Sequence, residues 1–252
     1  MAVGPKRIPD GTFPGRKFAC TASLFQFYYF CRQSHSMQLS KGLFFLMLFA
    51  GSWTISQAQV RIFAGPQYST TKYTIRNVKQ DTEGKQGFMA GIGLTYQVEG
   101  PLYFAPSLYF SQKGYKVSAY NLPSIPPNED ARNNDVTLRS IALTPLLQFN
   151  LSKKESFAFV RLGPGFEKAL SGREVFDSAG VKTIDRNMTF SSTAYSPATA
   201  FLNVQLGYEL ANGLCFLAHY EHGLSSLNNR DLGPMILQRS AGILIGWRFG
   251  KD

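Results

Sequence analysis

Bulky apolar residues alternate with small or polar residues along many segments of the chain that follows residue 58. In the clearest segment, FLNVQLGYEL at 201–210, every second residue is leucine, valine or tyrosine, while asparagine, glutamine, glycine and glutamate fall between them. Segments 88–98 and 240–249 show the same alternation. Because successive side chains of a strand point to opposite faces, a period of two predicts strands with one apolar and one polar face. Helical periodicity is nearly absent, so we predict an all-β fold.

The connections between these segments have two lengths. Short turns fall at 99–100, 152–155 and 211–213, and longer polar connections fall near 74–85, 118–134, 171–194 and 228–234. The two lengths alternate strictly, and the series begins and ends with a long connection. The pattern predicts eight strands, with both ends of this region on the side of the short turns. The expected strands are 60–72, 86–98, 101–117, 135–151, 156–170, 195–210, 214–227 and 235–249.

Such an arrangement is typical of an antiparallel, up-and-down transmembrane β-barrel. These barrels have an even number of strands, short turns on one side and longer loops on the other. Aromatic residues near strand ends suit the interfacial girdles of such barrels. The candidates are Tyr68, Tyr96, Tyr103, Tyr115, Tyr208, Tyr220, Trp247 and Phe249. Four prolines, Pro106, Pro145, Pro164 and Pro197, lie inside the predicted strands. Proline removes a ladder hydrogen bond, so we expect local errors in register there.

The segment before the strands has the layout of a secretory signal peptide. Residues 37–59 read MQLSKGLFFLMLFAGSWTISQAQ, with one lysine, an apolar run at 42–50, and small residues at Ser56 and Ala58. The apolar run is shorter than the roughly 20 residues that a membrane-spanning helix needs. A cleaved signal peptide is therefore favoured over a membrane anchor. We predict a signal peptide at 37–58 and cleavage before Gln59.

Residues 1–36 precede this signal peptide and contain Pro5, Pro9, Gly11, Pro14 and Gly15. They lack hydrophobic periodicity, so we predict a disordered extension produced by a start codon assigned too far upstream, with Met37 as the true start. The remaining residues, 59–252, are enough for one domain.

Charge and cysteine content narrow the functional classes. Residues 1–58 hold six of the 26 Lys/Arg and one of the 16 Asp/Glu, which leaves a net charge of +5 on 59–252. These charges are scattered singly, without the basic stripe that nucleic-acid binding requires. Cys215 is the only cysteine of 59–252. An intrachain disulfide and a zinc site of the cysteine type are therefore excluded from this region. We assign no cofactor and no catalytic or metal-binding residue.

Several segments, in order along 59–252, carry a family resemblance. They are GFMAGIGLTYQVEGPLYFAPSLYFSQKG at 87–114, IALTPLLQFNL at 141–151, FVRLGPGF at 159–166, LGYEL at 206–210, HYEHGLSSL at 219–227 and GILIGWRFG at 242–250. The chain resembles the porin-family outer-membrane β-barrel domain of Gram-negative bacteria. The resemblance implies a location in the outer membrane, contact with its lipid, and insertion by the barrel assembly machinery. One departure is the tail, where Phe249 is followed by three further residues.

The interior of an eight-stranded barrel is just wide enough for side chains to fill it. The alternation turns ten polar residues inward: Lys113, Gln148, Arg161, Glu167, Asn203, Gln205, Glu209, His219, Glu221 and Arg248. Opposite charges that pair across the lumen reduce the cost of burial. We therefore predict a polar network that plugs the lumen and a non-enzymatic structural or interaction role in the cell envelope. The network residues are Lys113, Arg161, Glu167, Glu209, His219, Glu221 and Arg248.

Two other functions remain open from the sequence. A soluble, exported, lipocalin-like barrel would turn the bulky apolar face inward around an apolar ligand. A lipid-modifying outer-membrane enzyme would use His219, with Glu221 on the same strand face to orient it. The sequence holds no GxSxG-like nucleophile elbow. The loops at 118–134 and 171–194 are long enough to bind a ligand or protein, but their composition identifies none.

Overall fold

The computed structural model describes residues 58–118, 131–178, 182–231 and 233–250. The predicted extension at 1–36 and signal peptide at 37–58 lie outside these ranges, apart from Ala58, as does most of the 118–134 loop. The described strands are β1 (Gln59–Ile75), β2 (Val78–Lys79), β3 (Asp81–Glu99), β4 (Leu102–Ser118), β5 (Ala131–Asn150), β6 (Phe157–Ser178), β7 (Lys182–Asn187), β8 (Ala198–Glu209), β9 (Leu214–Gly223) and β10 (Met235–Phe249).

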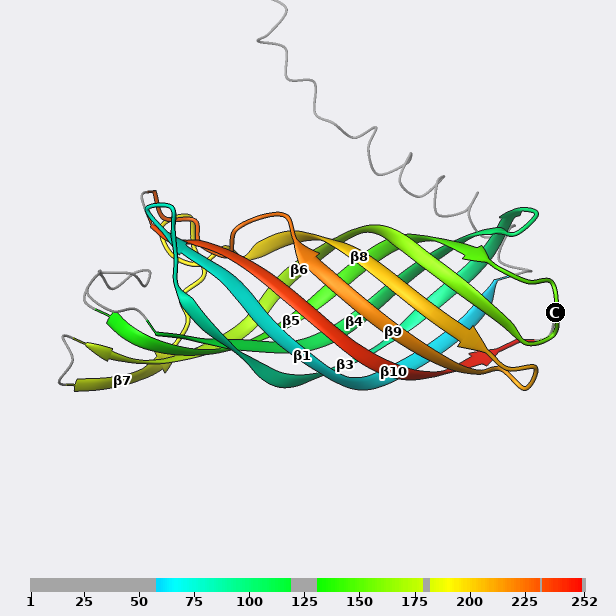
Figure 1. Ribbon diagram of the computed structural model, residues 1–252, viewed down its shortest axis with the longest axis horizontal. Helices are drawn as coiled ribbons and strands as arrows, with labels where there is room; N and C mark the ends of the chain where they lie inside the picture. Colours follow the sequence, from blue (N-terminus) through cyan, green and yellow to red (C-terminus); the bar gives the residue numbers. More distant parts are fainter. Residues whose placement is uncertain (1–57, 119–130, 179–181, 232, 251–252) are drawn as a thin grey trace, which may run out of the picture. The chain divides into compact units, whose positions relative to one another are not determined.

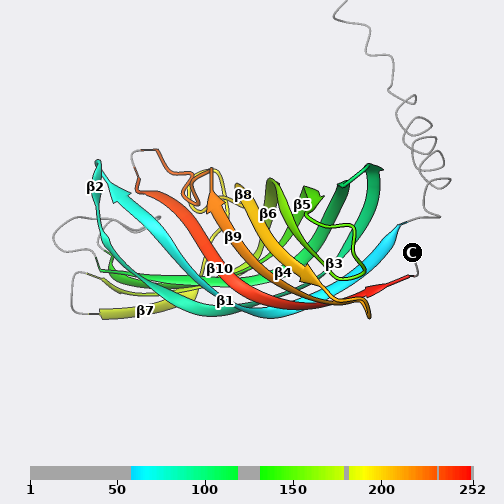
Figure 2. The ribbon, with the colours of Figure 1, turned by 45° about the vertical axis from the view of Figure 1, so that its right-hand side comes forward.

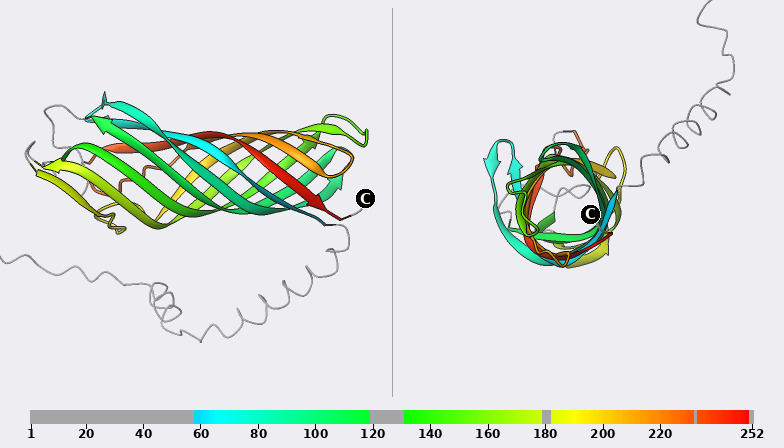
Figure 3. Two further views of the ribbon diagram at one scale, coloured as in Figure 1. Left: turned by 90° about the horizontal axis from the view of Figure 1, so that it is seen from below. Right: turned by 90° about the vertical axis from the view of Figure 1, so that its right-hand side faces the viewer.

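All of these strands except β2 and β7 form one closed, antiparallel ring (Figure 1; Figure 3, right). Each ring strand pairs with the next one along the chain, and β10 pairs with β1 to close the ring. The eight predicted strands are confirmed, with ends that differ from the expectation by a few residues in most strands. Val60 lies opposite Phe249, so the two ends of the ring's chain meet on the side of the short turns. We call this side the turn end and the opposite side the loop end.

The bulky apolar face of each strand points out of the barrel. Leu206 is 59% exposed and Ile243 is 64% exposed, whereas Asn203 and Glu209 on the other face of β8 are fully buried. Lipid is the solvent that favours an apolar outer face. This orientation contradicts the soluble lipocalin-like alternative, which required the apolar face to point inward.

Two of the predicted long connections continue as β-structure. The 74–85 connection is a hairpin whose tip, Arg76 and Asn77, has positive φ angles of 45° and 66°. Within 171–194, β6 extends to Ser178 and pairs with β7. Figures 1 and 2 show β7 at the loop end of the barrel. The sequence did not reveal these extensions, because strands that leave the lipid lose the bulky apolar face on which the alternation depends.

The aromatic residues divide between the two faces of the barrel. Tyr68, Tyr208 and Trp247 are exposed on the outside. The girdle prediction is wrong for Tyr115, which is 1% exposed inside the barrel, and for Tyr103, which lines a cavity at the turn end. Both have the parity of Lys113 on β4, and this parity already placed them on the inward face.

Proline interrupts the strands less than expected. β4, β5 and β6 run through Pro106, Pro145 and Pro164, and Pro106 lies opposite Pro145 across the β4–β5 pair. Pro197 lies outside the ladder, directly before β8. The β5–β6 register is the same on both sides of Pro145 and Pro164, so these prolines leave the ring closed.

Inside the barrel, apolar clusters lie on both sides of the polar residues around Lys113. One cluster toward the loop end includes Tyr73, Tyr115 and Leu138, and it also takes in Tyr195 and Leu227 from the loops. The other cluster lies toward the turn end. It contains Phe63, Met89, Tyr109, Ala142, Phe159, Phe201, Cys215, Leu217 and Leu244. The interior is therefore a packed core, more apolar than the sequence suggested.

The contact of the outward apolar face with lipid can be tested by placing a charge on that face. We expect Ile243→Arg, at the centre of β10 on the outward face, to lower the free energy of unfolding in lipid vesicles by roughly 2–4 kcal/mol, the cost of an arginine near the middle of the bilayer on a barrel's lipid face. Val78→Arg is the matched control, because Val78 is 56% exposed but lies at the tip of the β1–β2 hairpin. Its effect should stay within about 0.5 kcal/mol. Equal effects of the two changes, measured by denaturant titration, would contradict the membrane orientation.

Candidate functional site

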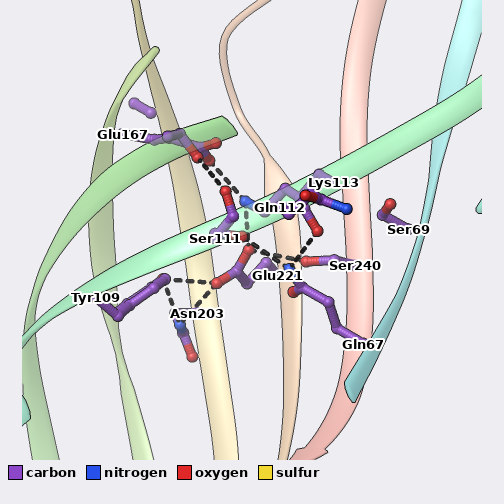
Figure 4. Close-up of polar contacts among 12 residues, drawn as sticks. Gln67, Ser69, Tyr109, Ser111, Gln112, Lys113, Glu167, Asn203, Glu221 and Ser240 are labelled. Atoms are coloured by element: carbon purple, nitrogen blue, oxygen red, sulfur yellow. Dashed lines mark hydrogen bonds and ion pairs between the residues drawn. The ribbon is translucent and has the colours of Figure 1, made fainter. Parts of the chain in front are cut away.

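Three buried charges from three strands meet in the middle of the lumen (Figure 4). Lys113 Nζ on β4 lies 2.6 Å from Glu167 Oε2 on β6 and 2.7 Å from Glu221 Oε2 on β9. Each of the three side chains is at most 4% exposed. We call these residues the central cluster. Their strands are not neighbours in the ring, so the ion pairs cross the lumen and join its walls.

Hydrogen bonds satisfy the remaining acceptor sites of Glu221. The Tyr109 hydroxyl donates to Glu221 Oε1 at 2.6 Å, and the Ser240 hydroxyl donates to Glu221 Oε2 at 2.8 Å. Lys113 Nζ also lies 5.0 Å from the centre of the Phe201 ring, a cation–π contact. Lys113 and Glu221, paired and hydrogen-bonded in this way, avoid much of the cost of burial, whereas Glu167 Oε1 has no hydrogen-bond partner among the described residues.

A second group of charges, the turn-end cluster, consists of Arg61, Arg161, Glu209 and Arg248. Arg61 pairs with Glu209, and Arg248 Nε lies 2.6 Å from the other oxygen of the same carboxylate. Arg161 donates to Gln148 Oε1 at 2.7 Å, and its guanidinium lies 4.7 Å from the Phe159 ring centre. The turn-end cluster thus holds three guanidinium groups and one carboxylate.

The structure places all seven predicted network residues inside the barrel and brings six of them together in two groups, with His219 in neither. Lys113, Glu167 and Glu221 form the central cluster, while Arg161, Glu209 and Arg248 belong to the turn-end cluster. Sequence reasoning missed Arg61, which is 2% exposed. Its signal was present, because Arg61 lies between the outward Val60 and Ile62 and so has inward parity.

His219 belongs to neither cluster by hydrogen bonding. It is 4% exposed, and neither ring nitrogen has a hydrogen-bond partner among the described residues. Glu221 lies on the same strand face, as predicted, but its carboxylate is engaged by Lys113, Tyr109 and Ser240. The base–hydroxyl contact that nucleophilic catalysis needs is not formed by His219 in the described part of the chain.

A third set of polar contacts lies at the loop end, beyond the apolar outer surface. Burial raises the pKa of Tyr195 well above its usual value, so its hydroxyl stays protonated and donates to Glu174 Oε2 at 2.6 Å. On β7, the hydrogen bond from Arg173 lowers the pKa of Asp185. Arg173 Nε donates to Asp185 Oδ1 at 2.7 Å, which gives the β6–β7 hairpin a cross-strand ion pair.

The described residues contain no group of three or more His, Cys, Asp or Glu side chains that could hold a metal ion. Across the same ranges, no helix has the length and apolar character needed to cross a membrane.

Removing the cation of the central cluster should lower the stability of the barrel strongly. Lys113→Met leaves Glu167 and Glu221 buried without their cation, and we expect it to cost about 3–5 kcal/mol in unfolding free energy. Adding Glu167→Gln and Glu221→Gln should recover most of the loss, because the uncompensated charges are then removed. Lys168→Met on the exposed face of β6 is the control and should change little. A Lys113→Met barrel as stable as the wild type in denaturant titration would show that the cluster contributes no net stability.

The chain is similar to the solved structures of Ail, the attachment invasion locus protein of Yersinia pestis (16% identity, 76% of this chain and 99% of that chain, TM-score 0.42), and of the outer membrane protein OprG from Pseudomonas aeruginosa (11% identity, 77% and 97%, TM-score 0.44). It is also similar to Neisserial surface protein A (15% identity, 77% and 98%, TM-score 0.38). No curated protein matches the sequence.

The match of the sequence to a protein family identifies the family. Residues 32–229 match the family described as "Outer membrane protein beta-barrel domain", which covers well over half of the chain and most of the described strands. The protein is therefore located in the outer membrane. The chain belongs to the outer membrane protein β-barrel domain family.

Proposed function

We propose that this protein is a closed, non-conducting and non-enzymatic outer-membrane barrel that holds rigid β-hairpins at the cell surface for a structural or interaction role in the envelope. The observation that carries the proposal is the central cluster, whose ion pairs join opposite walls of the lumen. A pore needs an aqueous path along the axis. The paired side chains of this cluster occupy that path.

The packing around the central cluster supports a closed lumen. The cavity beside Lys113, Glu167 and Glu221 has a volume of about 10 Å³, about the space that a single water needs. Toward the loop end, Tyr195 and Leu227 are at most 1% exposed and pack onto barrel residues such as Tyr115. The loops therefore cover the interior from the outside.

The β6–β7 hairpin supports a role in presentation. Its six cross-strand pairs run from Arg173 and Asn187 to Ser178 and Lys182. Phe176 is 1% exposed and packs against Ile184, while the Arg186 guanidinium lies 4.9 Å from the Phe176 ring centre. A hairpin with its own small core holds its outer surface in one arrangement, so a partner would meet little loss of conformational entropy on binding.

The environment of His219 supports a non-enzymatic role. The side chain is buried in the lumen, away from the lipid that an acyl-modifying enzyme would need to reach. It lacks a hydroxyl partner within hydrogen-bond distance among the described residues.

Electrical recording tests the closed lumen. We expect the purified barrel, inserted in planar bilayers, to give no regular single-channel steps, because the central cluster and the loops obstruct the axis. A porin recorded in the same bilayers is the positive control. Uniform steps that persist after repurification would assign a solute pore and contradict the proposal.

Cysteine labelling tests which hairpins face the outside. Expression from Met37 leaves Cys215 as the native cysteine, and it is fully buried. In intact cells a membrane-impermeant maleimide should label Thr183→Cys on β7, because the longer loops of such barrels face outward. Lys153→Cys, in a short turn, should react only after the outer membrane is permeabilised. The reverse pattern would overturn surface presentation by the β6–β7 hairpin.

A further inference from the structure

The barrel interior opens into a cavity at the turn end. Its volume is about 380 Å³, within the range of about 300–1,000 Å³ typical of small-molecule sites. The lining comes from the beginning of β1, the end of β10 and the turns around Gly100 and Ser152. These short turns face the periplasm in barrels of this kind. The cavity is therefore separated from the cell surface by the central cluster.

All charged groups that line this cavity are cations. They are Arg61, Arg248, Lys153 and Lys154, and the acids of the neighbouring turns, Glu99 and Glu155, are not part of the lining. The single carboxylate behind them, Glu209, is shared by Arg61 and Arg248. The guanidinium of Arg161 donates to the lining residue Gln148 and contacts Gln205 and the Phe159 ring, so it adds a further positive charge behind the cavity wall.

Arg61 supplies an independent sign of a ligand. Its Nη2 is engaged by Glu209, but its Nε and Nη1 are buried and lack a hydrogen-bond partner among the described residues. Burying donors of a charged group without partners is costly. A terminal guanidinium nitrogen without a partner, such as Nη1, can donate its N–H groups to an oxygen of a phosphate or carboxylate group.

We infer that the turn-end cavity is a binding site for a small polyanion that carries phosphate or carboxylate groups. The Arg61 guanidinium binds one anionic group at the bottom of the cavity, and Lys153 and Lys154 bind a second group at the rim. Amide and hydroxyl side chains, including Gln59, Asn150 and Ser152, provide neutral partners between them. This site is independent of the surface role of the hairpins, because it lies at the opposite end of the barrel.

Calorimetric titration of the full barrel, purified from outer membranes in a non-ionic detergent, tests this inference. The probe is inorganic pyrophosphate in about 0.1 M NaCl, in which weak long-range attraction between exposed charges is largely screened. We expect one saturable site. The double change Lys153→Gln and Lys154→Gln should weaken binding at least about tenfold, since it removes charge-assisted hydrogen bonds from an exposed turn that the fold does not depend on.

The control variant carries Lys72→Gln and Lys79→Gln, which remove the same charge at the loop end, and it should bind like the wild type. Arg61→Gln should also weaken binding at least about tenfold, with heat-modifiability on a gel showing that the barrel remains folded. A parallel titration with citrate separates the two chemistries, because the tighter probe identifies phosphate or carboxylate as the preferred group. The absence of saturable binding with both anions, or an equal loss in the control variant, would overturn the inference.

Discussion

The structure depends on one constraint, which is that backbone amides and carbonyls in lipid must find partners within the protein. A sheet meets this constraint only when it has no free edge, and here the pairing of β10 with β1 removes it. Closure brings Val60 and Phe249 together, so residues from the two ends of the domain share one wall. The strict alternation of apolar and polar residues follows from the same closure, because each strand then has lipid on one side and the narrow lumen on the other.

Closure also decides what the lumen must contain. Eight strands enclose a space that side chains fill, so an inward charge is buried whatever its position along the axis. The buried charges of Lys113, Glu167 and Glu221 compensate one another by pairing across the lumen. The ion pairs add no clear stability over an apolar core, but removing one partner leaves buried charge behind. The pairs therefore fix which side chains face each other and keep the axis closed.

Charge is distributed unevenly along the axis. The central cluster holds one cation and two carboxylates, whereas the turn-end cluster holds three guanidinium groups and one carboxylate. The two clusters nearly balance in total, yet they are held apart along the barrel axis. The positive excess faces the cavity on the side of the short turns, and the loop end carries polar hairpins with exposed ion pairs such as Arg173 with Asp185. The two ends of the barrel are thus chemically suited to different partners.

The sequence by itself determined the eight strands, their faces and the inward position of residues such as Lys113 and Glu221. Alternation records the contrast between lipid and lumen locally, strand by strand, so it needs no knowledge of partners. Only the tertiary structure decided which charges meet, since Lys113 and Glu221 are paired by the curvature and stagger of the ring. The β6–β7 hairpin and the ion pair between Arg61 and Glu209 were also revealed only by the tertiary structure. The hairpin was missed because strands outside the lipid lack the strict alternation of apolar and polar residues. The ion pairs were missed because contacts across the lumen join residues at irregular separations in the sequence.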